Sequence, residues 1–326
     1  MSIFVEVCLI CALRWLKHLK LETMKKYYLV TTEHLEDGLW FRDDEDFTTG
    51  MNHVAIQAAI TPEVIVLVFI LMSNHVHFVL YGTREEVEAF VNGFKGRYSL
   101  YLRHKYGDRE FLRRNGLDIM EISNEDAEAL ERAIAYVQMN CVAASICLYP
   151  GQYPWGTGNA FFRSGWVESG SGRRPVADKY CCLGGLSGRK RKRMMHSGDA
   201  LRLPEEWPIS DAGFVLPESY VDTDRVEAIF RSPRRMQYFL NSSSKARKRL
   251  GAEDENLPAF RDQVILGAMS DLLQSLFQKS DFDALSSSEQ AETLRQIRFR
   301  FSAGVHQSAR VCGISYAEAA RLLDTA

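Results

Sequence analysis

The densest apolar stretch of the chain, VLVFILMSNHVHFVLY, constrains the fold more than any other segment. Residues 64–72 form a continuous apolar run rich in β-branched side chains, which is typical of a central strand buried on both faces. Ser73 and Asn74 interrupt this run, and a second apolar segment follows over 75–81. Two strand-like segments with so short a break predict a β-hairpin inside a sheet.

The surrounding segments alternate between strand-like and helix-like patterns. The expected elements are a strand over 27–32, a helix over 46–60, the hairpin, a helix over 85–106, a strand over 117–122, and a helix from an Asn124 cap to about Cys147. This β-α-β-β-α-β-α order is the ferredoxin-like, split β-α-β plan with one added helix. We therefore expect an α+β fold, with an antiparallel sheet that carries its helices on one face.

The length of 326 residues suggests about two domains. Met24 opens the stretch MKKYYLV like a natural start, so residues 1–23 are expected to be an extension outside the fold and 24–155 the first domain. Residues 156–217 are rich in Gly, Ser and Arg and predict a connector, while 218–326 has an all-helical pattern.

The overall composition gives few functional clues. A net charge of −2 does not indicate a general nucleic-acid binder, although local basic faces can be hidden in such a sum. The seven cysteines, often within apolar segments, favour a reducing cytoplasm. Cys8 and Cys11 form a lone C-x-x-C, interpreted as small apolar residues rather than a metal or redox pair. Since no apolar run reaches the ~18 residues of a membrane span, we expect a cytoplasmic protein without a membrane partner.

Two groups of basic residues are candidates for DNA phosphate contact. The connector carries a cluster that is either a solvated loop or a phosphate-binding segment: Arg189, Lys190, Arg191, Lys192 and Arg193. The helix 85–106 and its sequel interleave basic and aromatic residues, which suits backbone tracking and base stacking, or else an amphipathic helix packed on the sheet. The phosphate contacts expected there are Lys95, Arg97, Arg113 and Arg114.

The C-terminal sequence VHQSARVCGISYAEAARLLD predicts two short helices. The first covers 305–311, Gly313 provides a turn, and Ser315 caps a second helix that ends at 323. This spacing is that of a DNA-binding helix-turn-helix over 305–323, or of an ordinary pair of helices joined by a glycine turn.

His75 and His77 are the strongest candidates for a chemical site. Residues i and i+2 of a strand project from the same face, so the two imidazoles can hold one divalent ion. By itself an H-x-H pair can also be structural or accidental. Tyr136 and Asn140 are four residues apart on a helix and share one face. Asn140 offers an amide oxygen as a third ligand, and Tyr136 offers a phenol one turn earlier.

The motifs around these residues resemble those of HUH single-tyrosine transposases. LMSNHVHFVL is similar to the family's MpNHvH motif, and AYVQMNCVAA resembles the later block in which a tyrosine precedes a metal-binding Asn or Gln by four residues. PGQYPWGTG, with Trp155, resembles the YPW segment that follows. The resemblance covers about residues 24–160 and points to the REP-associated tyrosine transposases (RAYT) and small insertion-sequence transposases.

The resemblance implies a metal-dependent enzyme that nicks and rejoins single-stranded or hairpin DNA. Tyr136 would be the nucleophile that forms a 5′-phosphotyrosine, and the ligands of Mg²⁺ or Mn²⁺ would be His75, His77 and Asn140. Cys141 stands where the family usually has a proline, so the helix can run on past Asn140. Relatives act as monomers or as homodimers, and either state is expected here.

Two other functions remain open at this point. A domesticated, non-catalytic DNA-binding protein could keep the same motifs and use the C-terminal helices. A metal phosphoesterase built on H-x-H is the second alternative. It would need a further H-x-T or H-x-S motif beside the pair and a supporting group of acidic residues, and no such acidic group stands out.

Overall fold

The computed structural model describes residues 24–33, 39–107, 116–123, 125–144, 146–162, 181–243, 260–301 and 303–324. Four strands form one sheet: β1 (Lys26–Thr32), β2 (Ile65–Met72), β3 (His75–Gly82) and β4 (Leu117–Glu121). Their order is β2-β3-β1-β4, and all neighbours pair antiparallel. The expected α+β class with an antiparallel sheet is confirmed. The predicted extension 1–23 and the cap Asn124 lie outside the described residues.

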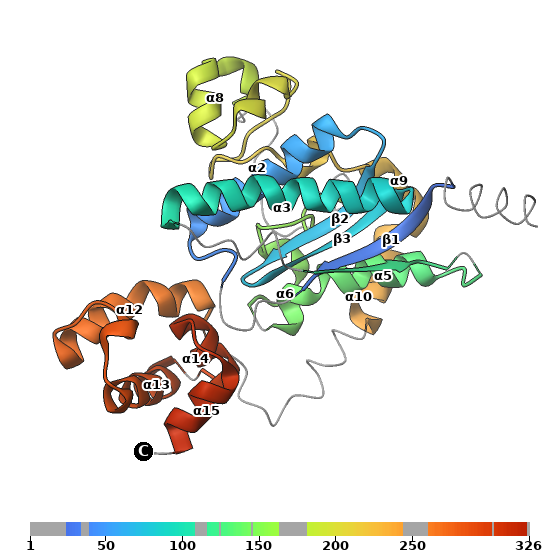
Figure 1. Ribbon diagram of the computed structural model, residues 1–326. Helices are drawn as coiled ribbons and strands as arrows, with labels where there is room; N and C mark the ends of the chain where they lie inside the picture. Colours follow the sequence, from blue (N-terminus) through green and yellow to red (C-terminus); the bar gives the residue numbers. More distant parts are fainter. Residues whose placement is uncertain are drawn as a thin grey trace, which may run out of the picture.

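Two helices, α2 (Asp44–Ile60) and α3 (Arg84–Tyr106), cover one face of the sheet (Figure 1). Asp43 caps α2, because its carboxylate accepts a hydrogen bond from the Asp46 amide, and the helix therefore starts two residues before the predicted position. Thr83 and Glu86 form a capping box at the start of α3.

Helices cover both faces of the sheet, so the expectation that they lie on one face is wrong. Phe78 packs against Phe90 and Phe94 of α3, whereas its neighbour His77 packs against Tyr136 of α5 (Ala129–Gln138). Because successive residues of a strand point to opposite faces, α5 lies on the face away from α3. Figure 1 shows the sheet between these two helical layers.

The helix that carries Tyr136 is shorter than predicted. It is interrupted at Met139 and resumes as α6 (Asn140–Ala143), instead of continuing to about Cys147. At the interruption the Asn140 side-chain amide donates to the backbone carbonyls of Tyr136 and Val137, at 2.9 and 3.2 Å. An asparagine side chain that competes for helix carbonyls in this way favours a break, which propensity alone does not predict.

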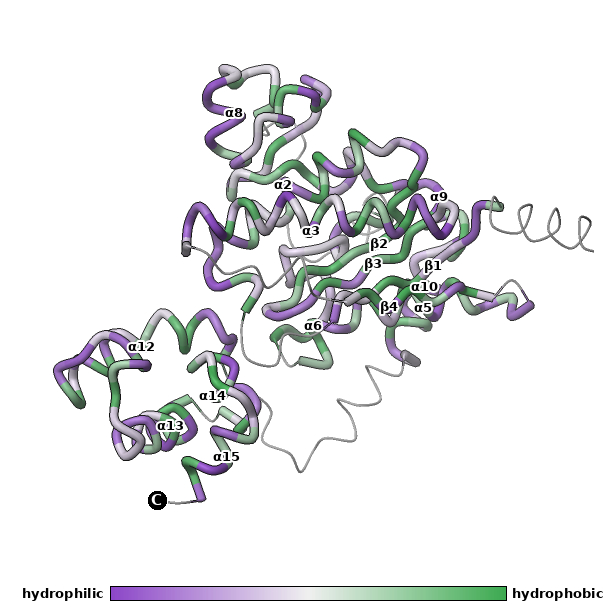
Figure 2. The backbone as a smooth tube through the Cα atoms, viewed as in Figure 1, coloured by the Kyte–Doolittle hydropathy of each residue, from purple (hydrophilic) through white to green (hydrophobic). Residues whose placement is uncertain are grey.

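A segment after α6 covers the outer edge of β2. β2 is hydrophobic along its length (Figure 2), and the amide of Leu71 donates to the Trp155 carbonyl at 2.9 Å. Gly156 forms a bridge with Ile70, and a Cβ atom at this glycine would lie 2.7 Å from the Phe69 carbonyl oxygen. Only glycine fits such an approach, so the YPW-like segment PGQYPWGTG, with the short helix η1 (Pro150–Gln152), closes this edge.

Residues 181–219, which include the described end of the predicted connector 156–217, contain several short helices. These are η4 (Leu183–Gly185), α8 (Gly188–Met194), η5 (Gly198–Arg202) and η6 (Pro217–Ser219). A small core forms where Leu183, Met195 and Val215 pack against Ala55 and Ile56 of α2. This part of the connector is therefore a packed unit on the outer side of α2.

The predicted helical region from residue 218 is divided between two cores. The helices α9 (Thr223–Phe230) and α10 (Pro233–Ser242) pack in the main core, which is the hydrophobic core of the sheet and its helices, through Val226, Phe230 and Phe239. The second core contains α12 (Asp262–Phe277), η7 (Phe282–Ala284), α13 (Ser287–Phe301), α14 (Val305–Cys312) and α15 (Tyr316–Asp324). We call these last five elements the C-terminal bundle. In the described parts of the chain, no helix has the length and hydrophobicity needed to cross a membrane.

Candidate metal and tyrosine site

The two histidines of β3 project from one face and meet at their tips. The Nε2 atoms of His75 and His77 are 2.9 Å apart, and the two ring planes are nearly perpendicular. Both side chains are buried, with exposed fractions of 7% and 2%. The spacing of the pair therefore brings two ring nitrogens to one point, as the sequence predicts.

Side-chain oxygens hold the opposite nitrogen of each ring. His75 Nδ1 lies 2.9 Å from Asn74 Oδ1, and His77 Nδ1 lies 2.8 Å from the Thr31 hydroxyl. The Asn74 oxygen can only accept, so His75 donates from Nδ1 and, when neutral, keeps its lone pair on Nε2. For His75 this is the tautomer that a metal ligand needs, whereas the Thr31 hydroxyl can donate to or accept from His77 Nδ1 and is compatible with either tautomer of that ring.

The geometry of the pair fits a divalent cation. Two nitrogens at about 2.1 Å from one ion and at right angles to each other lie about 3.0 Å apart. The 2.9 Å separation of the His75 and His77 Nε2 atoms is close to this value. Two ring nitrogens that each keep a lone pair at this distance repel each other unless a proton or a metal ion lies between them.

Tyr136 of α5 lies directly beside the histidines. Its ring meets the ring of His77 edge to face, with centroids 5.7 Å apart. Burial raises the pKa of the Tyr136 phenol, and the negative charge of Asp118 adds to this increase. A neutral phenol is a weak nucleophile, so Tyr136 would need activation before it could attack a phosphate.

Asn140 is buried one helical turn after Tyr136, and its amide group is engaged with its own helix. Both hydrogen bonds from Nδ2 go to backbone carbonyls of the preceding turn. With the NH₂ group occupied in this way, the oxygen Oδ1 is the part of the side chain that can ligate an ion. The structure brings His75, His77 and Tyr136 into contact, and Asn140 follows at the break between α5 and α6.

The structure adds Thr31, Asp118 and Asn74, to which the sequence analysis gave no role in the site. Thr31 pairs in register with His77 on one side and with Asp118 on the other, and these three residues form a polar row across the sheet below Tyr136. Asn74 was interpreted as a chain break within the histidine motif. Its position directly before His75 was the available signal, whereas Thr31 and Asp118 depend on strand register, which is not visible in the sequence.

The basic residues expected on α3 are engaged inside the protein. Lys95 is only 3% exposed, and burial lowers its pKa. Arg97 donates to the Gln57 side chain at 2.8 Å and forms an ion pair with Asp199 at 2.9 Å. Lys95 is therefore buried and Arg97 is paired within the protein, and Arg113 and Arg114 lie outside the described residues.

The predicted basic cluster of the connector lies on α8. Arg191 is buried and pairs with Glu205 at 2.9 Å, whereas the other four side chains are exposed: Arg189, Lys190, Lys192 and Arg193. α8 packs on the outer side of α2, and α5 lies on the opposite face of the sheet (Figure 1). The exposed cations thus lie on the other side of the molecule from Tyr136.

The chain contains one H-x-S sequence, at His306 and Ser308, but it is not near the histidine pair. It lies on α14 in the second core, where the His306 ring stacks on Tyr316 with centroids 4.0 Å apart. Within the described residues, no group of three or more His, Cys, Asp or Glu side chains forms a metal site. In the part of the chain that the structure describes, no second H-x-T or H-x-S motif of the kind that a two-histidine phosphoesterase needs lies beside His75.

Comparisons of the chain with protein-family models, with curated proteins and with solved structures found no significant match. The chemistry of the His75, His77 and Tyr136 side chains therefore carries the functional conclusion.

Proposed function

We propose that this protein is a metal-dependent enzyme that nicks and rejoins single-stranded, hairpin-bearing DNA through a covalent phosphotyrosine. One observation carries the proposal: the Nε2 atoms of His75 and His77 converge at 2.9 Å, and the Tyr136 ring packs against His77. The convergent nitrogens fit a divalent ion, and the adjacent phenol is a nucleophile of the kind that can hold a DNA phosphate.

The arrangement of strands supports the same proposal. The order β2-β3-β1-β4 places β3 between β1 and β2, as in the split β-α-β, ferredoxin-like plan. β3 then carries the ligands at the sheet centre, and α5 carries the phenol over them. α5 follows β4 along the chain, which is the position of the added helix in the β-α-β-β-α-β-α order expected from the sequence.

The proposed reaction conserves the energy of the phosphodiester bond. The Tyr136 oxygen attacks phosphorus, its proton is released, and the bond to the 3′ oxygen breaks, which leaves the 5′ phosphate on the tyrosine. Attack by a 3′-OH of another strand reverses the step and joins DNA. Mg²⁺ or Mn²⁺ held by His75, His77 and the Asn140 oxygen would withdraw charge from the phosphate and help the 3′ oxygen to leave.

The experiment that tests the proposal is capture of the covalent adduct. End-labelled hairpin oligonucleotides, taken from imperfect palindromes in the DNA that flanks the gene, are incubated with the protein and Mn²⁺. We expect an SDS-stable adduct on the Tyr136 peptide by mass spectrometry, and its loss in Tyr136→Phe by at least about 1,000-fold. Tyr149→Phe is the matched control, because Tyr149 is an exposed tyrosine.

The alternative is a non-catalytic DNA-binding protein, and the end of the C-terminal bundle favours it as the second candidate. Gly313 has a positive φ of 72° between α14 and α15, and Ser315 accepts a hydrogen bond from the Glu318 amide at the start of α15. These features support a helix-turn-helix. Hairpin binding without any adduct in wild-type protein would reject the enzyme and support this alternative.

A further inference from the structure

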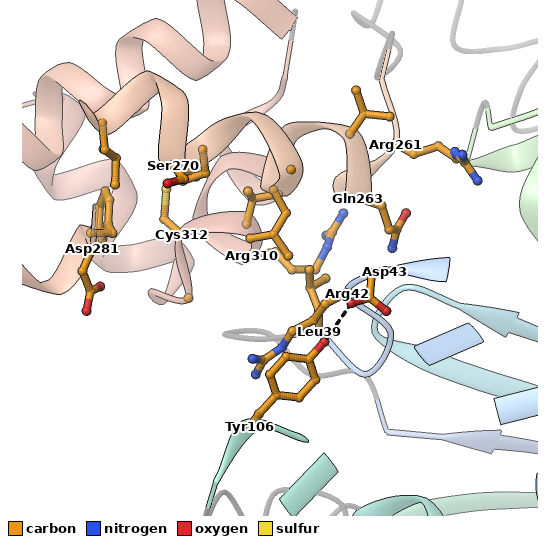
Figure 3. Close-up of a pocket in the computed structure, with 18 of the residues that line it drawn as sticks. Leu39, Arg42, Asp43, Tyr106, Arg261, Gln263, Ser270, Asp281, Arg310 and Cys312 are labelled. Carbon is orange, nitrogen blue, oxygen red and sulfur yellow. Dashed lines mark hydrogen bonds between the residues drawn. The ribbon is translucent and has the colours of Figure 1, made fainter. Parts of the chain in front are cut away.

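The first turn of α12 reaches from the C-terminal bundle to the turn that carries the histidine pair. Gln263 Nε2 donates to the Phe41 carbonyl at 2.8 Å and to the Ser73 hydroxyl at 3.3 Å. Figure 3 shows Gln263 beside a cleft of about 1030 Å³, which Arg42 and Tyr106 line from one side and α12 and α14 from the other. Gln263 thus bridges the C-terminal bundle and the sheet domain next to this cleft.

The turn that Gln263 contacts carries a hydrogen-bond partner of the His75 ring. The Ser73 carbonyl accepts hydrogen bonds from the amides of Trp40 and Phe41, at 2.8 and 3.1 Å. The next residue, Asn74, holds His75 Nδ1 through its side chain. A displacement of this turn therefore moves the partner that fixes the His75 ring.

Gln263 is itself fixed from the side of the bundle. The preceding residue, Asp262, is 4% exposed, and its carboxylate accepts two hydrogen bonds from Arg310, at 2.8 and 3.1 Å. Gln307 donates to the same carboxylate at 3.0 Å. Arg310 and Gln307 belong to α14, so a charge-assisted, bidentate contact ties the start of α12 to that helix.

We propose that Gln263 is a positioning residue through which the C-terminal bundle holds His75 in its metal-binding orientation. The contacts run from α14 through Asp262 and Gln263 to Ser73, Asn74 and the His75 ring. The inference rests on the proposed function in one respect, that His75 holds a metal ion. Loss of the Gln263 amide removes its bond to the Ser73 hydroxyl and its bond to the carbonyl of Phe41, whose amide in turn donates to the Ser73 carbonyl. The turn and the His75 ring are then less restrained, and the ion is bound less tightly.

The test compares Gln263→Ala with Gln274→Ala in the full chain. Gln274 is an exposed residue of the same helix and is a matched control. We expect Gln263→Ala to weaken Mn²⁺ binding by about 3- to 10-fold in an electron paramagnetic resonance titration, less than the loss of a direct partner of a ligand. Hydrogen exchange of the peptide that spans the Ser73 turn should become faster, and Gln274→Ala should change neither quantity.

A third variant separates the hydrogen bonds from the bulk of the side chain. Gln263→Glu keeps the length but cannot donate as a carboxylate, so it should behave like Gln263→Ala. Wild-type affinity in both Gln263 variants would overturn the inference, as would faster exchange without weaker Mn²⁺ binding. If His75→Ala binds Mn²⁺ as well as wild type does, the metal site of the proposed function fails and the inference fails with it.

Discussion

Buried histidines lie on both sides of the sheet, and the two environments differ in the hydrogen-bond partners that they give to the two ring nitrogens. On the α2 side, His53 Nε2 donates to the Met195 carbonyl at 3.0 Å, and in the described structure Nδ1 is buried without a hydrogen-bond partner. On the α5 side, the Nδ1 atoms of His75 and His77 each lie within hydrogen-bond distance of a side-chain oxygen, and their Nε2 atoms lie next to each other. Burial alone therefore does not distinguish a structural histidine from a candidate ligand.

The electrostatic surroundings explain why His53 is suited to a structural role. Burial lowers its pKa to about 3, and the charge of Arg97 contributes in the same direction. The ring therefore stays neutral and links α2 to the small core that Met195 helps to form. A polar atom without a partner costs stability, whereas two converging nitrogens form a site that a cation can occupy.

The largest expected effect in this comparison is an acid dependence of stability caused by His53. The unfolded chain binds a proton at His53 below about pH 6.5, and the folded chain does so only near pH 3, so stability falls as the pH drops between these values. By pH 4 this contribution is on the order of 3 kcal/mol. Urea unfolding at pH 7 and pH 4 should show a smaller loss for His53→Gln than for wild type, and equal losses would contradict the structural assignment.

A second, smaller effect concerns the partner of His77. Thr31→Val removes the hydroxyl at Nδ1 while the side chain keeps its shape. We expect Mn²⁺ affinity to fall by about 10- to 100-fold with little change in folding stability. Thr31→Ser restores a hydroxyl and should recover most of the affinity in the same titration. If the Thr31→Val variant binds Mn²⁺ as tightly as the Thr31→Ser variant does, the Thr31 contact has no role in metal binding.

The smallest effect is expected from Asp118, whose charge raises the pKa of Tyr136 in addition to the effect of burial. Asp118→Asn removes this charge, the phenolate becomes easier to form, and the pH profile of adduct formation should shift to lower pH. Glu121→Gln is the control, because Glu121 is on the same strand and pairs with Lys26 at 2.6 Å. A shift to higher pH in Asp118→Asn would show that the carboxylate assists proton removal instead.

Local patterns in the sequence predict most elements of the sheet domain. The apolar runs locate β2 and β3 to within one residue, and the helix over 85–106 starts one residue from α3. The two C-terminal helices predicted over 305–311 and up to 323 agree equally well with α14 and α15. Each of these elements is determined by side-chain periodicity and caps within a few residues.

The remaining features depend on contacts between distant residues. Arg97 is engaged because Asp199, about a hundred positions later, packs beside it, and no helical pattern contains that partner. The break after α5 depends on one side chain, Asn140, that captures backbone carbonyls. For the candidate site, the spacing of His75, His77 and Tyr136 is readable in the sequence, but the row through Thr31 and Asp118 requires strand register.

The contact between Leu71 and Trp155 has a consequence for how the site is connected. This backbone hydrogen bond closes a loop of the chain that runs from Leu71 to Trp155. This loop contains all four residues of the proposed site: His75, His77, Tyr136 and Asn140. The histidines and Tyr136 are separated by about sixty residues along the chain. They nevertheless belong to one loop, whose two ends meet at β2 beside the histidines.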